Sequence, residues 1–258
     1  MQWTTIFKKE MLEYWRNVKW IWVPLVFILL SIMDPITTYY LPQIIESVGG
    51  MPEGATFTMP ELPPADAFML SLSQLSMLGV AVVVLMSMGL ISGERKSGVT
   101  ELVLVKPVRY FNYISAKWAA TLVLVLGSLI VGLLSSWYYV NLLFGKLTFG
   151  ELIQTICFYG LWMALVVTIN TFYNTLFKTP GLVGGLTIIT LMVMGILNQI
   201  FNHSWTWFPN QISSYIVQSL HSGEIPSELW GTSIVTITVI IGLLIASLFT
   251  FRNREMAN

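Results

Sequence analysis

The stretch AFMLSLSQLSMLGVAVVVLMSMGLI, residues 67–91, carries no acidic or basic side chain. An α-helix needs about 20 such residues to cross the roughly 30 Å hydrocarbon core of a bilayer. A transmembrane β-barrel would instead show short segments of alternating polarity. The sequence therefore predicts an all-α membrane protein with six transmembrane helices, forming a single domain over residues 1–258. The other five spans are expected at residues 21–40, 118–144, 152–177, 182–201 and 231–251.

The composition of the whole chain supports this class. Hydrophobic residues make up 55% of the 258 and charged residues 10%, whereas a typical soluble domain has roughly 25% charged residues. The mean hydropathy is +0.73. The 13 basic residues balance the 13 acidic ones, which argues against a nucleic-acid partner. The single cysteine excludes an intramolecular disulfide and a cysteine-rich metal cluster.

The basic residues are distributed unevenly among the loops. All but Lys146 of the 13 fall before the first span, between the second and third, between the fourth and fifth, or after the sixth. Positively charged loops stay in the cytoplasm. We therefore expect both termini and the segment at residues 92–117 to be cytoplasmic, and the region at residues 202–230 to be external.

The first 19 residues predict an amphipathic helix that lies in the cytoplasmic membrane interface. Two roles are compatible with it: a passive anchor, or a lever that also contacts a cytosolic partner. Its apolar face should consist of Trp3, Ile6, Phe7, Met11, Tyr14, Trp15 and Val18. Its polar face should consist of Lys8, Lys9, Glu13, Arg16 and Asn17.

Few polar groups occur within the apolar stretches. Asp34, followed by Pro35, is the one ionisable residue well inside a span. A charge at the bilayer centre costs about 3 kcal/mol, so Asp34 either reaches the external interface or serves the pathway. Cys157 is expected to be a small buried side chain. Interhelical hydrogen bonds are expected from Asn141, Gln154, Asn170, Asn174, Asn198 and Gln199. Close helix packing is expected at the small-residue pairs Ser128/Gly132, Gly181/Gly185 and Gly242/Ala246.

The sequence contains none of the common catalytic motifs. It has no H-E-x-x-H zinc helix, no G-x-S-x-G nucleophile turn and no phosphate-binding P-loop. His203 and His221 fall in one region without a neighbouring cysteine, which is weak evidence for a metal site. We therefore predict no catalytic residue, no metal site and no cofactor in this chain, and expect that it is not an enzyme by itself.

The segment SGERKSGVTELVLVKPVR, residues 92–109, is the most informative polar region. It places the apolar run at residues 102–105 among charged residues, a pattern typical of docking to a protein or to a membrane surface. Gly98 permits a tight turn, and Pro107 ends the element that follows.

Residues 94–117 resemble the cytosolic segment of type-2 ABC permeases, the membrane subunits of ATP-driven exporters. The residues that match this pattern in register are Glu94, Gly98, Glu101, Leu102, Leu104, Pro107 and Lys117. Val99 stands where the family often has threonine, and Ala116 replaces the usual glycine. The start of the chain is similar to the family's elbow helix. Residues 202–230 are similar to its short or re-entrant helices at the outer mouth.

The resemblance implies a permease subunit of an ABC exporter in a bacterial plasma membrane. Two permeases would pair and form the substrate pathway between them, and two separate ABC ATPase subunits, which hold ATP and Mg, would drive alternating access. It assigns ATPase coupling to Glu94, Arg95, Gly98, Glu101, Leu102, Leu104, Pro107 and Arg109. It assigns the elbow helix to Lys8, Lys9, Glu10, Tyr14 and Arg16. Asp34, Pro209 and Tyr215 are the expected pathway or outer-gate residues.

Two other functions are compatible with the residues alone. A non-transporting membrane scaffold or immunity protein needs no catalytic groups either. A secondary transporter would need ion-coupling carboxylates, commonly in repeated halves, and the sequence offers only Asp34 and no repeat. A homodimer and a pair with a sister chain fit equally well, as do lipid, peptide, drug and polysaccharide substrates.

Overall fold

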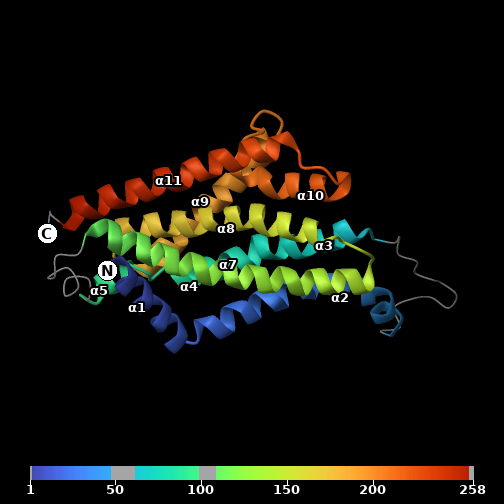
Figure 1. Ribbon diagram of the computed structural model, residues 1–258, viewed down its shortest axis with the longest axis horizontal. Helices are drawn as coiled ribbons and strands as arrows, with labels where there is room; N and C mark the ends of the chain where they lie inside the picture. Colours follow the sequence, from blue (N-terminus) through green and yellow to red (C-terminus); the bar gives the residue numbers. More distant parts are fainter. Residues whose placement is uncertain (1, 48–61, 99–108, 256–258) are drawn as a thin grey trace.

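A computed structural model describes residues 2–47, 62–98 and 109–255 of the chain. Within these ranges every regular element is helical and there is no β-strand (Figure 1). Six helices are long and apolar enough to cross a membrane, so the predicted all-α fold with six spans is confirmed. Four of the expected coupling residues lie outside the described residues: Glu101, Leu102, Leu104 and Pro107.

The six long helices alternate in direction along the bundle (Figure 1). The start of α1 and the end of α11 lie at one end, together with α5 and the start of α7, and we name it the terminal end. The start of α3 and all of α10 lie towards the opposite end, which we name the far end. The helices are α1 (Gln2–Arg16), α2 (Lys19–Ser47), α3 (Pro64–Gln74), α4 (Val80–Ser87), α5 (Ser92–Lys96), α7 (Tyr110–Leu143), α8 (Phe149–Leu176), α9 (Pro180–Phe201), α10 (Ile212–Ser222) and α11 (Ser227–Glu255).

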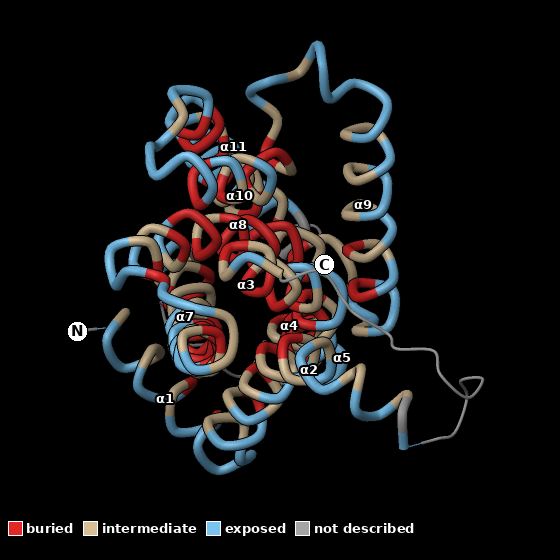
Figure 2. Tube along the Cα trace, turned by 90° about the vertical axis from the view of Figure 1, so that its right-hand side faces the viewer, coloured by how far each residue is buried: buried red, intermediate tan, exposed pale blue. Residues whose placement is uncertain are grey.

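Helix α8 is the centre of the bundle, and α9 is at its edge (Figure 2). In the most apolar window of α8, 72% of the residues are buried, against 17% for α9. Apart from Gln199, the exposed side chains of α9 are nevertheless large and apolar. A surface of this kind must face lipid or another protein chain, because water would not solvate it favourably. Those of α9 are Leu182, Ile189, Met192, Val193, Ile196, Ile200 and Phe201.

The second span is not one continuous α-helix. A π-helical turn, η1 (Leu75–Gly79), separates α3 from α4, and residues 88–91 form a turn between α4 and α5. Insertions of π-helix widen the local turn and are frequent at functional sites. The sequence predicted an unbroken span here, because hydropathy does not distinguish α from π geometry.

Small residues pack closely at one of the three expected pairs. A Cβ atom on Gly132 of α7 would lie 3.1 Å from the backbone oxygen of Phe27 on α2, so this glycine allows the two helices to approach. The other two predictions were wrong for contacts within this chain, because a Cβ on Gly181, Gly185 or Gly242 would have nothing within 4 Å. Cys157 is exposed on α8, which corrects the expectation that it is buried.

Helix α1 packs its predicted apolar face against the bundle rather than leaving it free. Phe7 and Met11 contact the main hydrophobic core, where Tyr14 is buried. The end of that face does not pack against the bundle: Trp15 is 66% exposed and Val18 49% exposed. Val18 lies in the turn to α2 with a φ of 58°. This left-handed conformation is unusual for a β-branched residue, and it falls where α1 gives way to α2.

Candidate functional site

A buried ion pair joins α1 to α7 at the terminal end. Lys117 lies near the start of α7 and is 1% exposed, and Glu10 of α1 is 2% exposed. The Lys117 Nζ lies 2.7 Å from Glu10 Oε1 and 3.1 Å from Glu94 Oε1 of α5. It also donates a hydrogen bond to the Leu90 carbonyl oxygen at 3.1 Å. One ammonium group on α7 therefore binds two segments that are far apart in sequence, α1 and residues 90–94.

Two further side chains complete this group. Lys9 Nζ lies 2.6 Å from Glu94 Oε1 and 3.2 Å from Glu10 Oε1. The Tyr113 hydroxyl donates to Glu94 Oε2 at 2.5 Å. We name Lys9, Glu10, Glu94, Tyr113 and Lys117 the ion cluster. Burial by itself would lower the pKa of Lys9, but the hydrogen bond to Glu94 and the charges of Glu10 and Glu94 outweigh it and raise that pKa above its ordinary value.

The ion cluster is not suited to hold a metal. Carboxylate oxygens of Glu10, Glu13 and Glu94 lie within 4.8 Å of one another, close enough to share a cation. The ammonium groups of Lys9 and Lys117 already provide the positive charge between them. A divalent ion would have to displace these lysines, so we assign no metal to this cluster.

One hydrogen bond on each side of the ion cluster fixes α1 along α7. The Tyr14 hydroxyl lies 2.7 Å from Thr121 Oγ1, and Trp3 Nε1 donates to Ser115 Oγ at 3.1 Å. Burial raises the pKa of the Tyr14 phenol, so this group stays neutral. Helix α1 and the start of α7 therefore form one unit.

Asparagine side chains of α8 hold the break between α4 and α5. Asn174 Oδ1 accepts hydrogen bonds from the backbone N–H groups of Ile91 and Ser92, both at 3.1 Å. Asn170 Nδ2 donates to Ser87 Oγ at 2.6 Å. Backbone donors at a helix start need such partners when they are buried. The expected interhelical role of Asn170 and Asn174 is confirmed.

The described coupling residues differ in where they point. Glu94 belongs to the ion cluster. Arg95 is 8% exposed, donates to the Thr175 carbonyl oxygen at 3.0 Å and lies over the Phe251 ring. Gly98 has a φ of 74°, which confirms the predicted turn, and Arg109 precedes α7 as its exposed N-cap.

The residues expected in the elbow helix differ in burial. Lys8 and Arg16 are exposed, whereas Glu10 and Tyr14 are buried.

The three expected pathway or outer-gate residues lie on α2, on a 3₁₀ turn, η2 (Pro209–Gln211), and on α10. Asp34 on α2 accepts a hydrogen bond from Gln74 Nε2 at 3.1 Å. Pro209 is buried at the start of η2. The Tyr215 hydroxyl on α10 donates to the Thr206 carbonyl oxygen at 2.9 Å.

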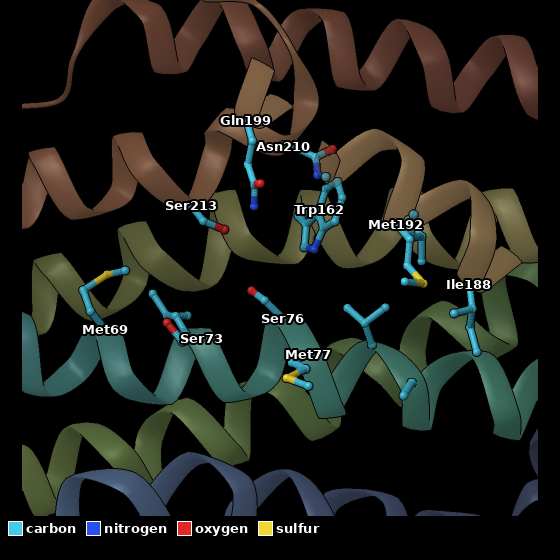
Figure 3. Close-up of a pocket in the computed structure, with 15 residues that line it drawn as sticks. Met69, Ser73, Ser76, Met77, Trp162, Ile188, Met192, Gln199, Asn210 and Ser213 are labelled. Atoms are coloured by element: carbon cyan, nitrogen blue, oxygen red, sulfur yellow. The ribbon is translucent and has the colours of Figure 1, made fainter. Parts of the chain in front are cut away.

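A groove of about 750 Å³ lies in the side of the bundle (Figure 3). It runs between α9 and the α3–η1–α4 span, with Trp162 of α8 among the residues that line it. Asp34, Pro209 and Tyr215 are not among its lining residues. It is lined by Met69, Leu72, Ser73, Ser76, Met77, Val80, Ala81, Trp162, Ile188, Leu191, Met192, Gly195, Gln199, Asn210 and Ser213.

Residues 4–256 match the family described as "ABC-2 family transporter protein". The chain belongs to this family. It is also 31% identical, over 253 residues and 97% of each chain, to a Bacillus subtilis (strain 168) protein named "Uncharacterized transmembrane protein YxlG". Family membership and the six spans together make this chain a multi-pass membrane subunit of an ABC transporter.

Sequence reasoning missed two features of this ABC-2 family chain. It placed Lys117 at the end of a cytosolic segment and did not pair it with Glu10. It also did not anticipate the groove, although Gln199 was expected to make an interhelical hydrogen bond. A signal for Glu10 was present, because it falls at helical spacing between Phe7 and Tyr14 on the face that packs against the bundle.

Proposed function

We propose that the chain is the permease subunit of an ABC exporter. It pairs with a second permease chain, identical or a sister, and binds two separate ABC ATPase subunits that hold ATP and Mg. Family membership supports the transporter role. The observation that carries the coupling is the ion cluster, because it ties α1 to both elements that flank residues 99–108, namely α5 and α7.

The contacts at the terminal end favour alternating access. A force that the ATPase applies to residues 92–109 moves α5, and Glu94 transfers that movement to α1 and α7 through Lys9 and Lys117. Helix α7 extends to the far end, and α5 continues through a short turn into α4, which lines the groove. Packed helices that move as units can convert a small displacement at one end into opening at the other.

The proposed orientation places the terminal end in the cytoplasm. Cysteines introduced at Glu53 and Glu224 in a Cys157→Ser background should react with a membrane-impermeant maleimide on intact cells, because the basic residues of the chain hold the other side inside. A cysteine at Ser97 should react only after the cells are permeabilised. Labelling at Ser97 in intact cells would contradict the orientation.

The division of labour between permease and ATPase can be tested directly. Affinity purification of the tagged permease from its native host should recover an ABC ATPase. The purified permease freed of that protein should show no saturable ATP binding, because the sequence lacks the backbone cradle and lysine of a P-loop. Saturable ATP binding by the permease alone, or no ATPase in the purified complex, would favour the scaffold alternative.

A further inference from the structure

The groove has different chemistry at its two ends. Its hydroxyl and amide groups lie in the half nearer the far end, where Met69 and Leu72 also line it, and Figure 3 shows those of Ser76, Gln199, Asn210 and Ser213 turned towards the groove. Towards the terminal end its lining is apolar, consisting of Val80, Ala81, Ile188, Leu191 and Met192. The groove is therefore apolar over most of its wall, and its polar groups are confined to the half nearer the far end.

The groove carries no compensating charge. No acidic or basic side chain is among the described residues that line it. An ionised ligand placed among these groups would lose hydration without gaining a counter-charge, and that costs several kcal/mol in an apolar surrounding. Hydroxyl and amide groups can instead exchange neutral hydrogen bonds with a ligand, both as donors and as acceptors.

The dimensions and flexibility of the groove suit an elongated ligand. Its volume of about 750 Å³ falls within the range of small-molecule sites. Met69, Met77 and Met192 supply unbranched side chains that adapt to irregular apolar shapes. The π-helical turn places Ser76 and Met77 in the wall, and Met77 is 74% exposed. The groove is thus open at its side, where a molecule dissolved in the bilayer could enter.

We propose that this groove binds an uncharged amphiphile. Its hydroxyl- or amide-bearing head lies against Gln199, Asn210 and Ser213, and its apolar body lies between α4 and α9. This inference rests on the proposed function, because it names the substrate class of the permease. It excludes anionic lipids and charged peptides as occupants of this groove.

The test uses the purified full-length chain in nanodiscs, without any ATPase. The probe is a monoacylglycerol with a photoreactive diazirine in its oleoyl chain. Labelling should be saturable, should map to α4 and α9, and should be displaced by unlabelled monooleoylglycerol. Oleoyl phosphate and oleylamine, which share the chain but carry a charge, should compete at least about tenfold more weakly, because the groove offers no counter-charge.

A matched pair of variants on α9 tests the location. A Cβ on Gly195 or on Gly185 would have nothing within 4 Å, but only Gly195 lines the groove. Gly195→Trp should weaken monooleoylglycerol binding at least about tenfold by filling the groove, whereas Gly185→Trp should change it less than about twofold. The double variant Gln199→Leu/Asn210→Leu should weaken binding by about tenfold through lost hydrogen bonds.

Three results would overturn the inference: non-saturable labelling, equal competition by the charged analogues, or equal effects of the two tryptophan variants. Because the assay contains no ATPase, its outcome is independent of the proposed coupling. Specific binding without a recoverable ATPase would retain the ligand site and reject the exporter. ATPase recruitment without binding would retain the exporter and reject this substrate class.

Discussion

Replacing Lys117 with methionine is expected to destabilise the protein by roughly 3–5 kcal/mol, the cost of breaking a buried ion pair by removing one partner. Glu10, which is 2% exposed, would lose its contact at 2.7 Å and have no route to bulk water. Lys9 lies 3.2 Å from the same carboxylate and compensates in part, so the lower end of that range is expected. Thermal unfolding of the detergent-solubilised chain, followed by size-exclusion chromatography, measures the loss.

Two variants separate the ion pair from a general effect of lost charge. Lys8→Met removes an exposed lysine from the same end and should change stability by no more than about 0.5 kcal/mol. Lys117→Met/Glu10→Gln removes both charges and should be more stable than Lys117→Met alone, because no uncompensated carboxylate remains at Glu10. If Lys117→Met is as stable as Lys8→Met, the ion cluster does not hold α1, α5 and α7 together.

The six spans could be predicted because their signal is local. Each apolar stretch is visible within about 20 residues, and the physics of the bilayer leaves few alternatives to a helix. The turn at Gly98 was predictable for a similar reason, since glycine adopts the left-handed backbone of a tight turn at no steric cost. The packing of Gly132 against Phe27 also followed from a pattern of small residues.

The ion cluster could not be predicted in the same way, because its pairs cross long stretches of chain. Lys117 and Glu10 are separated by 107 positions, and hydropathy gives no information about which helices become neighbours. Lys117 was counted among the cytosolic charges that set the orientation of the chain, so its burial was not anticipated. The groove depends even more on tertiary structure, because α3, η1, α4, α8, α9, η2 and α10 must all be placed before its lining exists. Periodicity alone could show only that Ser73 and Ser76 share a helix face.

The double substitution Leu102→Asp/Leu104→Asp is expected to abolish recovery of the ATPase with the tagged permease. If residues 92–109 dock in an ATPase groove, each leucine contributes about 1.5–3 kcal/mol of apolar burial. Losing both, and placing two carboxylates at the contact, should weaken association by at least about 100-fold. The measurement is the amount of ATPase in the affinity eluate at matched permease expression.

The conservative pair Leu102→Ile/Leu104→Ile keeps the apolar volume and should recover the ATPase at the wild-type level.

The ion cluster predicts a further difference, between binding of the ATPase and transmission of its movement to the membrane helices. Glu94 is held inside the protein by Lys9, Tyr113 and Lys117. The substitution Glu94→Gln should therefore leave ATPase recovery largely unchanged. It should nevertheless reduce transport, because it weakens the charged links between α5 and the α1–α7 unit. If residues 92–109 instead lie on the membrane surface, Leu102→Asp/Leu104→Asp will alter only the contact of this segment with lipid. Undiminished ATPase recovery with that pair would then show that another part of the terminal end binds the ATPase.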